Sequence, residues 1–280
     1  MDDMDIRLIA MDLDGTALQK DRCTFSPRLH AALEEAHARG IRILPVTGRQ
    51  FGLLPPVFEQ KRTWMDLAVV INGAQIRDLN TGDYSYRLDI DPQALRELLA
   101  LAEEYRLPIE FSIDSTLHLT QESYDLQLPW PDLIFHRDTI LAHHGKIVSS
   151  LVPLCDRRIE KVNLLCIPTE LRETVAARLG TVSVSAVWSS ASCMEITHPN
   201  ATKGQTLAIV CRQLGIPMKS VMALGDSGND ITMLQQAGLG IAMGNAPDFV
   251  KQAADTCTDH YDADGAAKAI EQYILNPKGG

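Results

Sequence analysis

Residues 8–16 read Leu-Ile-Ala-Met-Asp-Leu-Asp-Gly-Thr, an apolar run that ends abruptly in a polar turn. A buried strand has this pattern where the chain leaves a sheet for a loop. In an extended exit, residues i and i+2 point the same way, so we expect Asp12 and Asp14 to share one cavity. Two close carboxylates are tolerated where a divalent cation keeps one ionised, or where one has a raised pKa and serves as an acid. The stretch therefore predicts a chemically active strand end.

The pattern of strand, polar end and helix recurs along the chain. Ser26-Pro27 begins a predicted helix that ends at Gly40, and residues 41–46 and 67–71 are further apolar strands. Strands that alternate with helices predict a parallel sheet covered by helices, in which ligands bind beyond the carboxyl ends of the strands.

The middle third of the chain interrupts this rhythm with short extended segments and two helices. Strand and helix then alternate again, beginning with a predicted helix from Lys203 to Leu214 that Gly215 ends. We therefore predict an α/β fold with a Rossmann-like parallel sheet core and an inserted α+β domain. The predicted boundaries are 1–84 and 195–280 for the core and 85–194 for the insertion.

Composition excludes several classes of protein. The chain is 45% hydrophobic and 22% charged, with a formal net charge of −10 and no basic run, which argues against nucleic acid or an anionic membrane as a partner. Its apolar runs are far shorter than the ~20 residues that span a bilayer, and the first residues lack the order of a secretion signal. None of the six cysteines forms a Cys-x-x-Cys pair. We expect a soluble, cytoplasmic protein.

Four polar clusters lie at the predicted strand and helix ends. They are residues 12–16, residues 47–49, Lys203-Gly204 and residues 225–230. Asp226 could complete a site for Mg²⁺, which prefers oxygen ligands. Thr47 offers a hydroxyl to an anion, Lys203 a positive charge and Asn229 an amide. Each cluster alone is weak evidence, but all four in order predict a site for a phosphate group and a metal.

These clusters resemble the four motifs of the haloacid dehalogenase superfamily of phosphotransferases. The matching stretches are residues 11–16, residues 47–49, Lys203 and residues 225–230. The inserted segment resembles the α/β cap of the Cof-type phosphatases, and residues 72–74 and 242–246 also resemble that subgroup. The likeness runs from about Leu8 to Ile270.

The resemblance implies a Mg²⁺-dependent hydrolase of small phosphate monoesters, with sugar phosphates the leading class, and a cap that sets substrate specificity. Asp12 would attack phosphorus to form an aspartyl-phosphate, and Asp14 would protonate the leaving alcohol and later activate water. Mg²⁺ would be held by the carboxylates of Asp12 and Asp226 and by the backbone carbonyl of Asp14. Thr47, Lys203 and Asn229 would hold the phosphoryl oxygens, with the Leu13 backbone and Gly48 nearby, and Asp230 would orient Lys203 or a metal-bound water. The expected partner is a small phosphorylated metabolite, and the expected assembly is a monomer or small homo-oligomer.

Several alternatives stay open at this point. A phosphosugar mutase would return the phosphoryl group to a second hydroxyl, and a catalytically silent sugar-phosphate sensor could use the same fold. The retention of both Asp12 and Asp14 argues against the sensor. Arg49 could either contact the substrate or brace its loop through a carboxylate.

A separate segment imitates another class of phosphatase. Trp130-Pro131-Asp132 and the stretch from Cys166 to Arg172 mimic the acid loop and the Cys-x5-Arg phosphate loop of tyrosine phosphatases. A phosphate loop needs small residues and free N–H groups, whereas this one carries Pro168 and Glu170. We therefore predict that Cys166 has no catalytic role.

Overall fold

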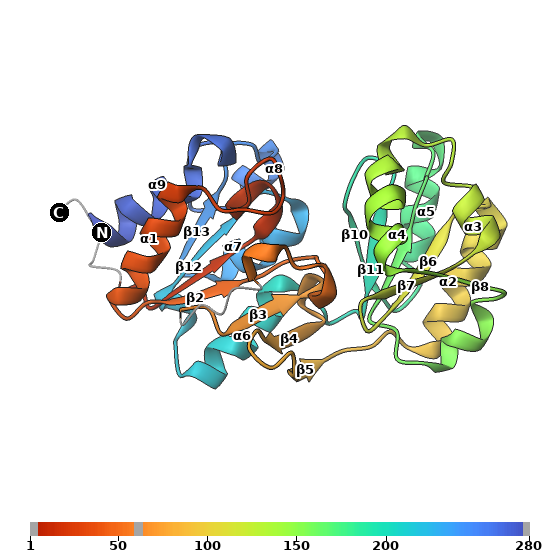
Figure 1. Cartoon of the computed structure of the whole chain (residues 1–280), viewed down its shortest axis with the longest axis horizontal. Helices are drawn as coiled ribbons and strands as arrows, with labels where there is room; N and C mark the ends of the chain where they lie inside the picture. The colour runs from red at the N-terminus through yellow and green to blue at the C-terminus, as the bar shows by residue number, and fades with distance from the viewer. Residues whose placement is uncertain (1–4, 59–63, 277–280) are drawn as a thin grey trace. The chain divides into compact units, whose positions relative to one another are not determined.

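A parallel sheet of five strands forms the centre of the first unit in the computed structural model, which describes residues 5–58 and 64–276 (Figure 1). The strand order is β14-β13-β12-β1-β2, and all neighbouring pairs are parallel. The strands are β1 (Leu8–Met11), β2 (Arg42–Pro45), β12 (Val221–Gly225), β13 (Leu239–Ala242) and β14 (Thr256–Cys257). Because β1 pairs with β12, the centre of this sheet contains strands from both the N-terminal and the C-terminal part of the chain.

Helices cover both faces of this sheet, because successive strand residues point to opposite sides. The helices of this unit are α1 (Pro27–Ala38), α6 (Lys203–Leu214), α7 (Ile231–Gln236), α8 (Asp248–Lys251) and α9 (Gly265–Ile270). Ile9 and Met11 of β1 join one buried apolar cluster with residues of α1 and α9, whereas Leu8 and Ala10 join another with residues of α6 and α7.

The ends of the longer helices follow the signals in the sequence. The Ser26 hydroxyl accepts a 3.0 Å hydrogen bond from the backbone N–H of Leu29 at the start of α1. Helix α6 ends at Gly215, which has a φ of +65° that suits glycine. The predictions of these two helices are confirmed.

The third predicted strand differs from expectation in its partners. β3 (Leu67–Val70) pairs antiparallel with β4 (Gln75–Asp78), which pairs with β5 (Tyr84–Arg87). It meets the parallel sheet through one bridge, from Val46 to Val69. The local reason is the turn after β3, where Asn72 and Gly73 have φ values of +52° and +101° and reverse the chain at once.

The second unit contains a six-stranded sheet of order β10-β11-β9-β6-β7-β8. All neighbours are antiparallel except β7 and β8, and the strands are β6 (Ile109–Ile113), β7 (Thr116–Thr120), β8 (Gly145–Val148), β9 (Lys161–Leu164), β10 (Ser185–Trp188) and β11 (Met194–Thr197). Helices α2 (Pro92–Tyr105) and α5 (Arg172–Leu179) pack their apolar residues against one face, and α3 (Gln121–Asp125) and α4 (Ala142–His144) are short. Strand β8 was not predicted.

The chain divides into these two units after Arg87 and again after Ala201. The expected boundaries, after residues 84 and 194, differ because β5 continues to Arg87 and because β11 pairs with β9 and β10 in the second sheet. Residues 1–4, 59–63 and 277–280 of the expected core lie outside the described residues.

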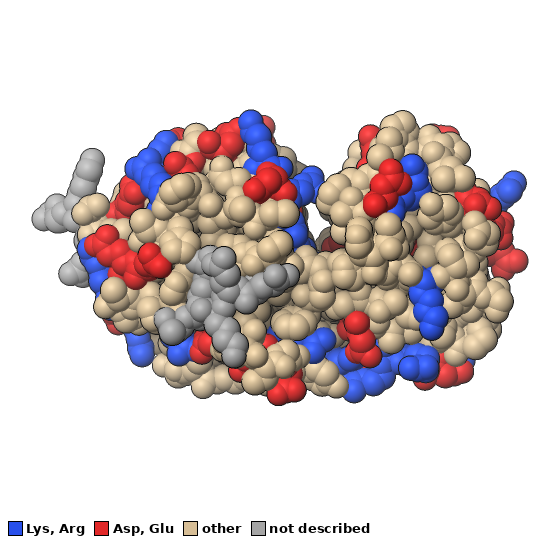
Figure 2. Space-filling view, viewed as in Figure 1, with Lys and Arg blue, Asp and Glu red and all other residues tan. Residues whose placement is uncertain are grey.

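Charged side chains of both signs are interspersed on the face of the protein that Figure 2 shows. Within residues 5–58 and 64–276, no helix is both long enough and apolar enough to cross a bilayer.

Candidate active site

Two neighbouring strands bring Asp12 and Asp226 together. In the register of β1 and β12, Met11 stands opposite Leu224, and the backbone N–H of Asp12 donates a 3.0 Å hydrogen bond to the carbonyl of Leu224. Asp12 and Asp226 follow directly beyond these strands, so both side chains emerge at the carboxyl edge of the sheet. Oxygens of Asp12, Asp226 and Asp230 all lie within 4.8 Å of one another.

Lys203 places a positive charge among these carboxylates. It is the first residue of α6, and its Nζ lies 2.6 Å from Oδ1 of Asp12 and 2.6 Å from Oδ1 of Asp230. Its side chain has no exposed surface. Burial alone would lower the pKa of Lys203, but the two carboxylates outweigh it and raise that pKa. The lysine is therefore held as an ammonium ion.

Asp230 uses both carboxylate oxygens for hydrogen bonds within the protein. Oδ1 accepts from Lys203, and Oδ2 accepts from the backbone N–H groups of Asp226 and Ser227 at 2.9 Å each. Gly225 leaves room for this arrangement, because a Cβ there would lie 2.5 Å from Cβ of Asp230. Asp230 thus orients both Lys203 and the loop that carries Asp226.

Burial favours the protonated forms of Asp12 and Asp226. It raises the pKa of Asp12 well above 3.8, against the opposing pull of Lys203, and it raises the pKa of Asp226 to about 6. The chain passes close to Asp226 at Gly15, where φ is +74° and a Cβ would lie 2.3 Å from Oδ2 of Asp226. Thr16 Oγ1 donates to Asp226 Oδ1 over a longer 3.4 Å.

Asp14 has a different partner from Asp12. Its Oδ2 and Oδ1 accept 2.7 Å hydrogen bonds from Nε and Nη2 of Arg49, a two-point ion pair. Arg49 also donates to the carbonyls of Arg22 and Leu53, at 3.0 and 3.3 Å. Arg49 was expected either to contact the substrate or to brace its loop through a carboxylate, and this geometry agrees with the second role. The side chain of Asp14 does not belong to the group formed by the other three aspartates.

Two of the segments predicted to hold phosphate follow neighbouring strands, with Leu13 just after β1 and Thr47 and Gly48 just after β2. Thr47 is buried, its Oγ1 accepts from the backbone N–H of Arg49 at 3.1 Å, and its own N–H donates to the Val69 carbonyl at 2.9 Å. Gly48 is the next residue in the chain. Leu13, which follows Asp12 in the sequence, has a fully buried side chain.

Asn229 is oriented by two side chains. Its Nδ2 donates to Oδ1 of Asn72 at 2.9 Å, and its Oδ1 accepts from Oγ of Ser227 at 2.7 Å. The backbone N–H of Asn72 in turn donates to the Thr47 carbonyl at 3.0 Å. Sequence reasoning assigned no role to Asn72, Ser227 or Asn245, although Asn72 stands in an Asn-Gly turn and Asn245 in a Gly-Asn pair.

The second unit contains a buried polar cluster of its own. Glu110 on β6 is fully buried and accepts hydrogen bonds from His136 at 3.0 Å, Asn163 at 3.1 Å and Gln127 at 3.1 Å. Burial alone would raise the pKa of Glu110, but these three partners outweigh it and lower that pKa. The cluster joins the loop that follows α3 to the sheet.

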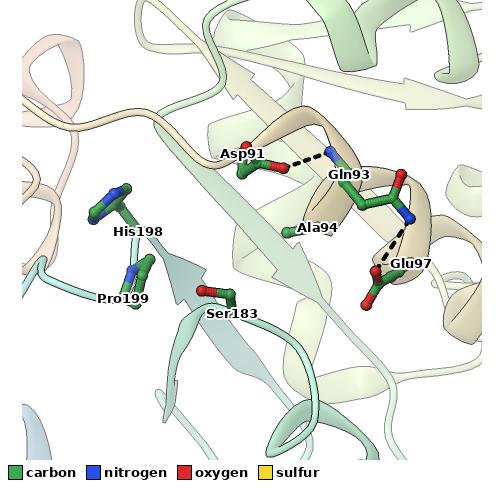
Figure 3. Close-up of a pocket in the computed structure, with 7 residues that line it drawn as sticks. All are labelled: Asp91, Gln93, Ala94, Glu97, Ser183, His198 and Pro199. Atoms are coloured by element: carbon green, nitrogen blue, oxygen red, sulfur yellow. Dashed lines mark hydrogen bonds between the residues drawn. The ribbon is translucent and has the colours of Figure 1, made fainter.

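A shallow pocket of about 310 Å³ also lies in the second unit (Figure 3). It is lined by the first turns of α2, by Ser183 and by His198 and Pro199 after β11. Its two acidic lining residues, Asp91 and Glu97, accept hydrogen bonds from Gln93. It shares no residue with the carboxylate site of the first unit.

A family profile described as haloacid dehalogenase-like hydrolase matches residues 9–270. The chain is 30% identical over 275 residues to the 5-amino-6-(5-phospho-D-ribitylamino)uracil phosphatase YcsE of Bacillus subtilis, covering 98% of each. It is 28% identical over 284 residues to the pyridoxal phosphate phosphatase YbhA of Escherichia coli, covering 97% of this chain and 100% of that one. The solved structure of the HAD subclass IIB sugar phosphatase BT4131 matches with a TM-score of 0.79 and 26% identity, over 95% of this chain and 98% of that one.

Proposed function

The chain belongs to the haloacid dehalogenase-like hydrolases and is a phosphatase, and on this premise we propose that it hydrolyses small phosphate monoesters through an aspartyl-phosphate, with Mg²⁺ as its cofactor. One observation carries the proposal. The ammonium of Lys203 is buried between Asp12 and Asp230, beside Asp226, at the carboxyl edge of a parallel sheet. Such a site combines a carboxylate nucleophile with positive charge for phosphoryl oxygens.

The donor set at this edge fits Mg²⁺. Asp12 and Asp226 are crowded, and burial raises the pKa of both, so a divalent cation would relieve the cost of ionising them. Asp230 is a poorer ligand because hydrogen bonds occupy both of its oxygens. We assign the metal to the carboxylates of Asp12 and Asp226 and the backbone carbonyl of Asp14. When bound, it would reduce the repulsion between an anionic nucleophile and an anionic substrate.

Each proposed chemical step uses residues of this site. An oxygen of Asp12 attacks phosphorus as the ester P–O bond breaks, and the leaving oxygen takes a proton from Asp14, which enters this step in its protonated form. Asp14 then takes a proton from a water molecule, whose oxygen attacks phosphorus and releases Asp12 with inorganic phosphate. Oδ2 of Asp12 has no hydrogen-bond partner among the described residues, which supports its role as the attacking atom, since Lys203 holds Oδ1.

The phosphoryl oxygens would be held by charge and by fixed hydrogen-bond donors. We assign this to Lys203 and to the side chains of Thr47 and Asn229, with the backbone near Leu13 and Gly48. The Thr47 hydroxyl already accepts from the backbone of Arg49, so its own proton points elsewhere and is available to an anion. Asp230 supports the set by orienting Lys203.

Sugar phosphates are the substrate class we propose first, because the BT4131 structure is described as that of a sugar phosphatase. The names of YcsE and YbhA add a ribityl-linked pyrimidine phosphate and pyridoxal phosphate as further small phosphorylated metabolites to test. We propose that the second unit, residues 88–201, acts as the cap that sets specificity, and that the enzyme works in the cytoplasm as a monomer or small homo-oligomer.

Substitution of the nucleophile tests the mechanism. Asp12→Asn keeps the size of the side chain and should lower turnover of p-nitrophenyl phosphate and of a panel of sugar phosphates on the order of 10⁴-fold or more. Asp83→Asn, an exposed carboxylate in the β4–β5 turn, is the matched control and should leave turnover unchanged. Near-normal activity of a folded Asp12→Asn protein would overturn the mechanism. A rearranged phosphosugar in place of inorganic phosphate would indicate a mutase, and inactivity of the wild type across the panel would indicate a sensor.

A further inference from the structure

Asn245 makes three hydrogen bonds at the edge of the carboxylate site. Its Nδ2 donates to Oδ2 of Asp226 at 3.0 Å and to the backbone carbonyl of Gly15 at 2.9 Å. Its Oδ1 accepts from the backbone N–H of Tyr261 at 3.2 Å. The side chain therefore joins three loops that follow different strands of the parallel sheet.

The partners determine which way this amide points. A backbone N–H can only donate, so the oxygen of Asn245 must face Tyr261. The Gly15 carbonyl and the Asp226 carboxylate can only accept, so the nitrogen must face them. With both amide protons and the oxygen engaged, rotation of the amide would break all three bonds at once.

Asp226 has few other restraints on its carboxylate. The contact from Thr16 is long, at 3.4 Å, and Gly15 has no side chain that could touch it. Asn245 therefore makes the shorter of the two side-chain hydrogen bonds to the Asp226 carboxylate. Because the same amide holds the carbonyl of Gly15, it also fixes the distance between the loop after β1 and the loop after β12.

The support for Asn245 is itself built into the fold. The backbone N–H of neighbouring Gly244 donates to the Asp259 carbonyl at 3.0 Å. The turn that carries Tyr261 is closed by a 3.1 Å hydrogen bond from the backbone N–H of Gly265 to the carbonyl of His260. The last loop of the unit is thus connected to Asp226 through one side chain.

We propose that Asn245 is a positioning residue that holds the Asp226 carboxylate in the orientation needed to bind Mg²⁺, an inference that rests on the proposed function. Its side chain bonds to a proposed metal ligand and to two backbone groups, and not to the proposed nucleophile or acid. A hydrogen-bond partner behind a metal ligand typically contributes 10- to 100-fold to metal affinity. The effect of Asn245 should therefore appear in Mg²⁺ binding before it appears in chemistry.

Calorimetric titration of the metal-free protein with Mg²⁺ tests this directly. Asn245→Ala should weaken the Kd for Mg²⁺ by about 10- to 100-fold, whereas kcat at saturating Mg²⁺ should change by less than about fivefold. Thr16→Val removes the longer contact to Asp226 and should weaken Kd less than Asn245→Ala does. Asn80→Ala, in the exposed β4–β5 turn, should leave Kd unchanged.

The outcomes separate this inference from the proposed function. An unchanged Kd in a folded Asn245→Ala protein, or a loss of kcat that saturating Mg²⁺ does not restore, would overturn the role of Asn245. Failure of the wild type to bind Mg²⁺ would overturn the metal assignment instead. If Asn245→Ala does not fold, Asn245→Leu preserves the volume of the side chain and must show the same loss of affinity.

Discussion

Nζ of Lys203 lies 2.6 Å from Oδ1 of Asp12, and the lysine side chain is entirely buried. An ion pair without access to water depends on both partners, because either charge left alone would be desolvated and unpaired. Loss of either partner is therefore expected to destabilise the first unit as well as to affect its chemistry.

Removal of the lysine should destabilise the protein as well as inactivate it. Lys203→Met leaves Asp12 and Asp230 buried without their cation, and we expect the free energy of unfolding to fall by roughly 3–5 kcal/mol. Urea denaturation measures the change. Lys268→Met is the control, since Lys268 forms a 2.6 Å pair with Asp259 at the surface and should change the midpoint far less. Equal shifts in the two variants would contradict this account.

Loss of the proposed acid should depend on the leaving group. Asp14→Asn should lower turnover of an alkyl phosphate by about 10²- to 10⁴-fold, because an alkoxide needs a proton to leave. p-Nitrophenolate leaves without one, so this ester should still phosphorylate Asp12 and give a rapid burst of nitrophenolate before slow hydrolysis. Stopped-flow absorbance records the burst. Equal losses on the two substrates, with no burst, would remove Asp14 from the role of acid.

Because Arg49 pairs with the proposed acid Asp14, weakening this pair should lower kcat and leave KM nearly unchanged. Arg49→Lys keeps the charge but loses the two-point contact, and it should lower kcat by roughly 10-fold with KM changed by less than about twofold. Arg28→Lys is the matched control, because Arg28 makes the same two-point contact with Glu271 at the surface. A large rise in KM for Arg49→Lys would show that Arg49 contacts the substrate.

Magnesium affinity should depend on pH near the raised pKa of Asp226. Protons compete with the metal for Asp226 below about pH 6, so Kd should rise about tenfold per unit as the pH falls further. In the metal-free protein the folded state favours protonated Asp226. The free energy of unfolding should therefore fall as the pH rises from about 4 to about 6, and saturating Mg²⁺ should restore it.

Titration calorimetry and thermal unfolding over this pH range measure both effects. Asp226→Asn provides the comparison, since it has no carboxyl to titrate at this position. Its free energy of unfolding should therefore depend less on pH between about 4 and 6 than that of the wild type. A Kd that stays constant down to about pH 5 would show that protons do not compete with Mg²⁺ for Asp12 or Asp226.

Cys166 should be chemically inert despite its tyrosine-phosphatase-like surroundings. It packs in a buried apolar cluster, and burial raises its pKa to about 12, so almost none is thiolate at neutral pH. Cys166→Ser should change kcat/KM by less than about twofold. In the folded wild type, iodoacetamide should label exposed Cys23 and leave Cys166 unmodified, as peptide mass spectrometry would show. Loss of activity on alkylation of Cys166 would contradict this.

The features that could be predicted from the sequence are those with local causes. The apolar run before Asp12 and the caps at Ser26 and Gly215 depend on neighbours a few residues away. The third strand meets the parallel sheet through a single parallel bridge and forms its full pairing with β4, because an apolar run does not specify which strand it pairs with. Strand β8, with the exposed sequence Gly-Lys-Ile-Val, carries too weak a pattern to be recognised.

The sequence by itself determined which chemical groups this protein has and that each stands at the end of a strand or helix. Only the tertiary structure decided their partners. The pairing of β1 with β12 brings Asp12 beside Asp226, although more than two hundred residues separate them in the sequence. The packing of the neighbouring loops likewise brings Asp14 into contact with Arg49 and Asp226 into contact with Asn245. The physical reason is that hydrogen bonds and ion pairs act over a few ångströms in space, whatever the separation along the chain.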